Sequence, residues 1–232
     1  MARNRIRTAL GIALALVGLG LITAYLLRDY NVTSGYDSTP FKFALVCLTL
    51  ATSIAYFFLE PHSKATALWL VLALTFTLCA DVFLLLLDNY YEVGIGFFIA
   101  AQLCHFAHIY RLGGKRYIHL VVSLCMRAGA SVAVGVSLFA FGYGSALNIL
   151  AGIYASNLLA NAVESVLFLF RKYGDIRCFI CLAIGFLLFV GCDVFVGLNF
   201  LGQGDYRLMW LFYGPSQVLI CLSGNFVHEN RS

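Results

Sequence analysis

The stretch ATALWLVLALTFTLCADVFLLLL, residues 65–87, decides the fold of this chain. It is an unbroken apolar run of the length that a helix needs to cross a bilayer, and Asp81 is its one charged residue. The phrase around Asp81, LCADVF at residues 78–83, returns as VGCDVF at residues 190–195, where Asp193 takes the same place. Because an ionisable group inside a membrane is costly and is usually kept for function, both aspartates are predicted to be functional.

The composition indicates an all-α, polytopic membrane protein. Hydrophobic residues make up 62% of the 232 residues, charged residues 11%, and the mean hydropathy is +0.89. This is more apolar surface than the core of a soluble protein could bury. The first apolar run is longer than the core of a signal peptide and lacks a clear cleavage site, so we expect it to be retained. Eight apolar runs, each about 20 residues long, predict eight transmembrane helices in one domain spanning residues 1–232. They cover about residues 6–28, 41–59, 65–87, 93–111, 117–140, 145–170, 178–199 and 208–226.

The distribution of Lys and Arg predicts that both termini are cytoplasmic. With the N-terminus inside, only Arg28, Lys42 and Arg207 fall outside, and many more basic residues fall inside. The inner set is Arg3, Arg5, Arg7, Lys64, Arg111, Lys115, Arg116, Arg171, Lys172, Arg177 and Arg231. The loops at residues 88–92 and 201–207 then face outward. The net charge of +4 lies mostly in loops, where it concerns topology and lipid and gives no support to nucleic-acid binding.

The spacing of polar residues predicts an internal repeat of four helices plus four. The separation in sequence between Asp81 and Asp193 nearly equals the separation between Gln102 and Gln217. The repeat units therefore cover about residues 1–116 and 117–232. An even number of spans per unit gives parallel repeats, related by an axis along the membrane normal. Each aspartate lies six residues from the outer end of its span, and therefore roughly 9 Å below the outer edge.

Other polar residues form groups at helical spacing. Gln102 and His105 share one face of the fourth span, and Tyr213 and Gln217 share one face of the eighth. These residues either orient a carboxyl and a lipid headgroup or join helices by hydrogen bonds. The sixth span carries a polar stripe at spacings of three and four, formed by Tyr154, Asn157, Asn161 and Glu164.

Arg127, in the fifth span, is predicted to reach Glu164 in the sixth. The pair is either structural or part of a site.

Metal, redox and soluble-hydrolase chemistry receive little support from the sequence. The eight cysteines lie in or beside apolar runs, where free cysteine behaves as a small hydrophobe, and Cys178-x-x-Cys181 stands alone. His105 and His108 have no third ligand at a recognisable spacing. The motifs of serine hydrolases, zinc proteases and P-loop ATPases do not occur, and no cofactor is expected.

Two carboxyls in a low-dielectric site can divide the work of acid catalysis. One is held neutral as a general acid and the other is left ionised, which suits cleavage of an acetal-like or vinyl-ether bond. A buried, hydrogen-bonded pair that fixes helix packing is the structural alternative. The two-acid mechanism requires Asp81 and Asp193 to face one common site.

Three phrases resemble the YhhN family of eight-span proteins, which includes animal lysoplasmalogenases. They are TFTLCADVFLLLLDNYYEVGIGFFIAAQLCHFAHIYRL at residues 75–112, LLFVGCDVFVGLNF at 187–200 and WLFYGPSQVLICLSGN at 210–225. Asp81 and Asp193 match the acidic positions of that family, and Gln217 matches its late glutamine. Many members have His where this chain has Gln102 and Tyr where it has His105.

The resemblance implies an intramembrane hydrolase that cleaves the vinyl-ether bond of lysoplasmalogen to a fatty aldehyde and a glycerophospho-headgroup. Asp81 and Asp193 would be catalytic, while Gln102, His105, Tyr213 and Gln217 would orient them. A proton-coupled carrier or lipid transporter, or a non-catalytic membrane protein, are the alternatives. The expected location is the plasma membrane of a bacterium, with a membrane lipid as the partner.

Overall fold

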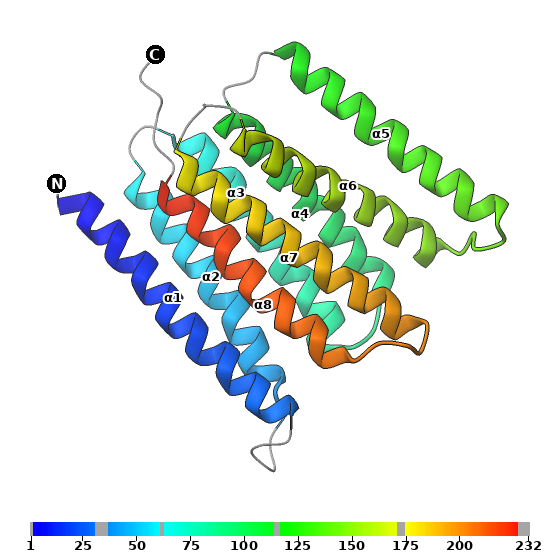
Figure 1. The fold of residues 1–232 in the computed structure, drawn as a ribbon, viewed down its shortest axis with the longest axis horizontal. Coiled ribbons are helices and arrows are strands. Elements are labelled where there is room, and N and C mark those ends of the chain that lie inside the picture. The colour runs from blue at the N-terminus through cyan, green and yellow to red at the C-terminus, as the bar shows by residue number, and fades with distance from the viewer. Residues whose placement is uncertain (1, 31–36, 61–62, 114–116, 171–174, 227–232) are drawn as a thin grey trace.

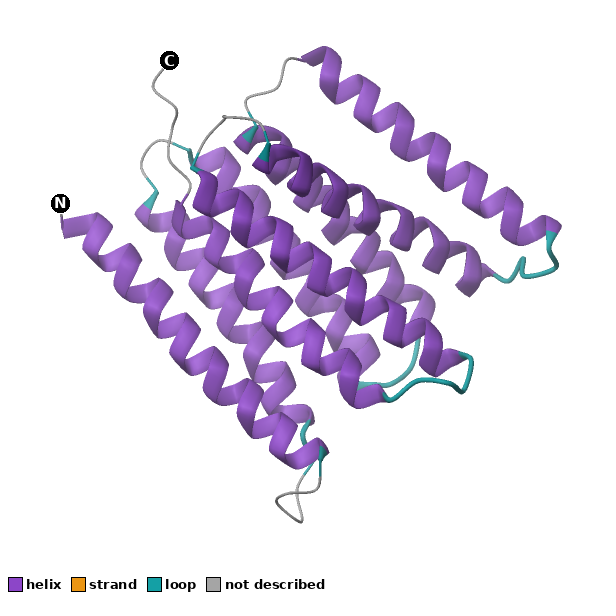
Figure 2. Ribbon diagram, viewed as in Figure 1, coloured by secondary structure: helices purple, strands orange, loops and turns teal. Residues whose placement is uncertain are grey.

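The computed structural model describes residues 2–30, 37–60, 63–113, 117–170 and 175–226. Helices account for the regular structure of these residues, and no strand occurs among them (Figure 2). The elements are α1 (Ala2–Asp29), α2 (Thr39–Leu59), α3 (Lys64–Asp81), the π-helix η1 (Val82–Leu86), α4 (Tyr91–Leu112), α5 (Tyr117–Ala140), α6 (Ala146–Leu169), α7 (Ile176–Phe200), α8 (Tyr206–Ser223) and the 3₁₀ turn η2 (Gly224–Phe226). The all-α prediction is confirmed, and the eight long helices coincide with the eight predicted runs.

The chain is a multi-pass membrane protein. Seven helical segments, from α1 to α7, are long and apolar enough to cross a bilayer. The shorter α8 contains Arg207, Pro215 and Gln217, which lower its apolar content. The eighth span therefore stays a prediction, as do the repeat of four helices plus four and the cytoplasmic side of the termini.

The helices form a closed bundle with one peripheral member. Going round the bundle, α1 packs against α2, α2 against α3, α3 against α4, α4 against α6, α6 against α7, and α7 against α8, which returns to α1 and α2. Helix α5 packs chiefly against α6 and lies at the edge of the bundle (Figure 1). Half of the membrane segment of α4 is buried inside the protein (50%), against 6% for α5. Large apolar side chains such as Met126 and Phe139 therefore point outward from α5, as expected for a surface that faces lipid.

Local sequence signals explain where several helices begin. The side chains of Ser145, Asp175 and Asp205 accept hydrogen bonds from backbone N–H groups in the first turns of α6, α7 and α8. Short polar side chains at this position satisfy donors that have no partner within the helix. Pro40 lies in the first turn of α2, where its missing N–H is tolerated.

Both ends of the described chain lie at the same end of the bundle (Figure 1). The Arg7 guanidinium on α1 donates to Glu60 at 2.6 Å and to the carbonyl of Gly224 at 2.7 Å, so it joins α1, α2 and the end of α8. At the opposite end Lys42 on α2 pairs with Asp29 on α1 at 2.8 Å. Ion pairs thus fix α1 to its neighbours at both ends of the bundle.

Helices α7 and α8 approach each other closely at Gly185. A β-carbon at this position would lie 2.8 Å from the Ile220 side chain and 3.2 Å from the Ile220 backbone nitrogen. Small residues at such positions let membrane helices gain van der Waals contact. This contact sets how near α8 lies to α7, and both helices carry residues of the predicted site.

Candidate active site

Asp81 lies where α3 changes from α-helical to π-helical geometry. The five residues that follow it, Val82–Leu86, form the π-helix, and the Leu87 N–H donates to the Val82 carbonyl five residues back. Short π segments inside helices are frequent at functional sites. The third span nevertheless continues to Leu86, so Asp81 lies inside the span, five residues from its end.

Tyr213 on α8 is the hydrogen-bond partner of Asp81. Its hydroxyl donates to Oδ2 of the carboxyl at 2.7 Å, and the exposed fractions of the two residues are 5% and 4%. The two residues are 132 positions apart in the chain. The hydrogen bond fixes the orientation of the carboxyl and joins α3 to α8.

Asp193 on α7 has a tyrosine partner of its own. The Tyr154 hydroxyl on α6 lies in hydrogen-bonding contact with the Asp193 carboxyl. Asp193 is half-buried, and its Oδ2 atom is enclosed without a hydrogen-bond partner among the described residues. Each aspartate therefore has a tyrosine hydroxyl beside it.

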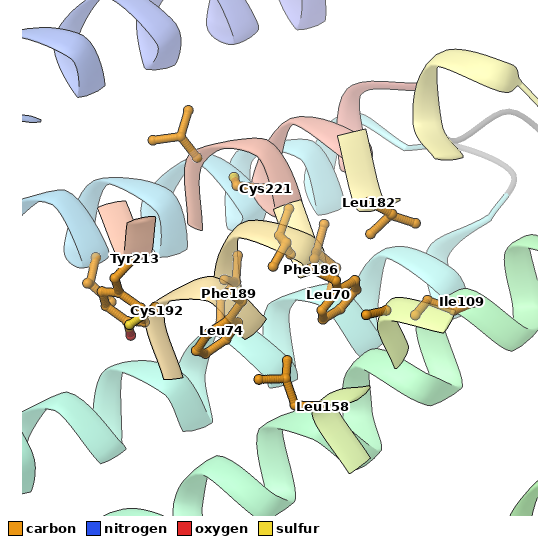
Figure 3. Close-up of a cluster of buried hydrophobic side chains, with 14 of the residues drawn as sticks. Leu70, Leu74, Ile109, Leu158, Leu182, Phe186, Phe189, Cys192, Tyr213 and Cys221 are labelled. Carbon is orange, nitrogen blue, oxygen red and sulfur yellow. The ribbon is translucent and has the colours of Figure 1, made fainter. Parts of the chain in front are cut away.

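The two aspartate–tyrosine pairs face the same buried region. Both carboxyls lie within electrostatic range of Tyr154 and of Cys192. The ring of Phe189 contacts both tyrosines, with centroid distances of 6.5 Å to Tyr154 and 5.4 Å to Tyr213. Figure 3 shows Tyr213 beside Cys192, with Phe189 next to them in the same cluster. Both carboxyls therefore lie near the same side chains, and their action in one common site stays a prediction.

The other predicted orienting residues lie deeper in the bundle. Gln217 is one helical turn inward of Tyr213, roughly 6 Å along α8. The Gln102 side-chain oxygen accepts a hydrogen bond of 2.8 Å from Asn161. The ring of His105 packs edge-on against Phe186, with a centroid distance of 5.2 Å. Phe186 is seven residues inward of Asp193, or about 10 Å along α7. An orienting role for Gln102 and His105 stays a prediction.

The two histidines of α4 have different surroundings. His108 contacts the backbone carbonyl of Thr66 through Nδ1 at 2.8 Å, while both ring nitrogens of His105 are buried without a hydrogen-bond partner in the described part of the chain. Within the same ranges, no group of three or more His, Cys, Asp and Glu side chains could hold a metal ion. All eight cysteines are free.

Arg127 forms the predicted ion pair, and the pair belongs to a larger network. Its guanidinium donates to Glu164 at 3.1 Å and to the Asn161 side chain at 2.8 Å. Ser123 donates to the other Glu164 oxygen at 2.6 Å, and Asn161 continues the network to Gln102. These hydrogen bonds attach the peripheral α5 to α6 and α4. Three residues of the polar stripe, Tyr154, Asn157 and Asn161, are buried inside the protein.

Sequence reasoning placed Tyr154 in the polar stripe without assigning it to the site. The feature that could have indicated a site role for Tyr154 is its position near the outer end of the stripe, at the depth expected for Asp193. Thr77 was also missed, although it lies one turn before Asp81 on the same face of α3. Threonine is common in apolar helices, so its presence in the third span does not by itself indicate a site residue.

The arrangement provides the parts for acid–base chemistry on an uncharged bond. Two carboxyls in one enclosed region can donate and accept protons at neighbouring atoms, and the two phenols hold them in fixed orientations. The ring of Phe189 contacts both tyrosines, and apolar surroundings of this kind strengthen electrostatic contacts.

The chain matches the YhhN family over residues 38–224. This range contains both aspartates and both tyrosine partners. Comparison with curated proteins and with solved structures returned no significant match. Because the match covers more than half of the chain, the protein belongs to the YhhN family.

Proposed function

We propose that the protein is an intramembrane hydrolase of lysoplasmalogen-type lipids. It would cleave the vinyl-ether bond and release a fatty aldehyde and a glycerophospho-headgroup. Membership of the YhhN family is consistent with this activity. The single observation that carries the proposal is the shared site of the two aspartate–tyrosine pairs, in which Tyr213 donates to Asp81 at 2.7 Å and Tyr154 contacts Asp193.

The chemistry of the bond explains why two carboxyls are useful. A vinyl ether is hydrolysed by protonation at carbon, which creates an oxocarbenium ion that water then attacks. A neutral carboxyl supplies the proton, and a carboxylate stabilises the cation and accepts a proton from water. Asp81 and Asp193 are the two acids of the site, and neither has a lysine or arginine partner among the salt bridges of the described residues.

The direction from which the substrate arrives follows from the predicted topology. With both termini cytoplasmic, the two aspartates lie nearer the outer leaflet, and a single-chain lipid would enter from there. The expected location is the bacterial plasma membrane. The four-plus-four repeat would place Asp81 and Asp193 in equivalent positions of the two halves.

The deciding experiment incubates the purified protein in detergent with lysoplasmalogen and follows aldehyde release. We expect activity in the unchanged protein and a loss of about 100-fold or more in Asp81→Asn and in Asp193→Asn, because each removes an acid–base group. Asp205→Asn, at the exposed N-cap of α8, is the matched control. Activity that survives both substitutions would refute the assignment.

The same preparation tests the alternatives. In liposomes, proton-coupled uptake of a lipid or small molecule without product formation would identify a transporter. Normal folding of both Asp variants, with neither hydrolysis nor flux in the unchanged protein, would indicate a non-catalytic role.

A further inference from the structure

The side chains one helical turn inward of the two aspartate–tyrosine pairs differ in polarity. Residues four apart on a helix lie on one face, so each site residue has a neighbour directly inward of it. Below Asp193 on α7 this neighbour is Phe189, and below Tyr154 on α6 it is Leu158. Both are buried, with exposed fractions of 1%. Figure 3 shows Phe189 and Leu158 in the same apolar cluster.

The ring of Phe98 completes this apolar side. It lies 6.0 Å from Phe189 and 5.4 Å from Tyr154, measured between ring centroids. Asp193 is therefore placed above aromatic and aliphatic side chains. An alkyl chain gains contact with such a surface, whereas water would find no hydrogen bonds there.

The side of Asp81 is polar. Thr77 is one turn inward of Asp81 on α3, and Gln217 is one turn inward of Tyr213 on α8. Both side chains are fully buried, at 0% exposed. Within the described ranges, Thr77 Oγ1 and Gln217 Oε1 have no hydrogen-bond partner.

The register of α3 and α8 sets these two side chains at the same level of the bundle. The helices meet at Asp81 and Tyr213, and again where Leu70 packs against Gly224, whose β-carbon would lie 2.8 Å from Leu70 Cδ2. From the first contact to the second, each helix runs inward by eleven residues. A position four residues inward on α3 is therefore level with the position four residues inward on α8.

Buried hydroxyl and amide groups are nearly always hydrogen-bonded, either to protein or to ordered water. A water molecule needs two to four polar partners, and the Thr77 hydroxyl, the Gln217 side-chain oxygen and the Asp81 carboxyl supply three. A water bound by these groups would lie directly below the carboxyl that could accept its proton.

We infer that the two aspartates have different roles: Asp193 is the general acid that protonates the alkenyl chain, and Asp81 is the base for a water molecule held by Thr77 and Gln217. This inference rests on the proposed function and extends it to the direction of the reaction. The alkenyl chain lies against Phe189 and Leu158, and the water lies on the side of Thr77.

The proton balance closes without any co-reactant other than water. Asp193 donates its proton to the second carbon of the alkenyl group, and the C=C bond becomes an oxocarbenium ion at the first carbon. The water oxygen bonds to that carbon, and the water gives a proton to the Asp81 carboxylate. The product of this addition is a hemiacetal. The hemiacetal then breaks its bond to the glycerol oxygen. That oxygen takes the proton from Asp81, the hemiacetal hydroxyl returns a proton to Asp193, and the aldehyde leaves.

Thr77 and Gln217 act through the water and are positioning residues. Thr77→Val keeps the shape of the side chain and removes only its hydroxyl. Thr75→Val is the matched control, because the Thr75 hydroxyl two residues away already donates to the Val71 carbonyl at 2.8 Å. Thr77→Ser restores the hydroxyl and separates its loss from a packing defect.

The first test measures aldehyde release in water and in water with added methanol, which competes for the oxocarbenium ion and gives a mixed acetal. We expect Thr77→Val to lower kcat by about tenfold, the effect of one lost hydrogen bond, with little change in KM. The ratio of acetal to aldehyde should rise, because the bound water has lost a partner. Thr77→Ser should recover both values, and Thr75→Val should match the unchanged protein. An unchanged product ratio in Thr77→Val would overturn the water site.

The second test assigns the two acids by chemical rescue with azide, an anionic nucleophile that needs no base. Azide should restore turnover in Asp81→Asn by trapping the cation as an azido ether. It should not restore turnover in Asp193→Asn, where no cation forms. Rescue of Asp193→Asn, or of neither variant, would overturn the assignment. Absence of aldehyde with the unchanged protein would instead refute the proposed hydrolase activity.

Discussion

At the scale of single residues, the site depends on two phenol hydroxyl groups that hold the carboxyls. The sequence predicted both aspartates and Tyr213, because a polar residue in an apolar run is visible without any structure. It did not assign Tyr154 to Asp193, since pairing between side chains on different helices depends on how the helices pack. In the described part of the chain, Tyr213 is the one predicted orienting residue that hydrogen-bonds an aspartate.

Tyr213→Phe tests the importance of this hydrogen bond. The substitution removes the donor to Asp81 but keeps the ring that contacts Phe189 and Trp210. We expect kcat for aldehyde release to fall about tenfold, with little loss of stability, because a hydrogen bond to a charged or acidic group contributes roughly 1.5 kcal/mol or more. Tyr143→Phe, at an exposed position between α5 and α6, is the control and should leave kcat unchanged. Equal kcat values in the two variants would show that the Tyr213 hydroxyl does not act on Asp81.

At the scale of helices, the distance between α7 and α8 controls the geometry of the site. Asp193 is carried by α7 and Tyr213 by α8, and the two helices approach closely where Gly185 faces Ile220. The apolar runs predicted where these helices lie along the chain, and their bounds agree within a few residues. The close contact at Gly185 was not predicted, because glycine inside a membrane helix has several possible reasons.

Gly185→Ala should separate α7 from α8. The added methyl group would lie 2.8 Å from the Ile220 side chain and 3.2 Å from its backbone nitrogen, so one helix must move. We expect a loss of about 1–3 kcal/mol in stability, typical of overpacking, seen as a lower Tm in detergent. Gly197→Ala, on the same helix, meets no atom within 4 Å and is the matched control. A Tm for Gly185→Ala equal to that of Gly197→Ala would contradict the contact.

At the scale of the whole molecule, helices α1 to α4 and α6 to α8 form a closed bundle, and α5 lies at its edge. The Arg127 network holds α5 against α6, and the predicted ion pair is present at 3.1 Å. The two termini of the described chain lie at one end, as Arg7 and Gly224 show by their hydrogen bond of 2.7 Å. The count of basic residues predicts that this end is cytoplasmic, which the arrangement of helices alone does not decide.

Reporter fusions test the predicted topology. Alkaline phosphatase, which is active only outside the cytoplasm, should be active when fused after Gly142, between α5 and α6. It should be inactive when fused after Gly113, at the end of α4. The opposite pattern of activity would show that the topology is inverted and that the two aspartates lie nearer the inner leaflet.

The sequence by itself determined the apolar runs, the two aspartates and the resemblance to the YhhN family. These features are local, because a helix can satisfy its backbone hydrogen bonds inside one segment and an apolar run can be read without its neighbours. Only the tertiary structure decided that Tyr213 hydrogen-bonds Asp81 and that Tyr154 lies beside Asp193. These contacts join helices far apart in the chain, and the packing of whole helix faces selects them.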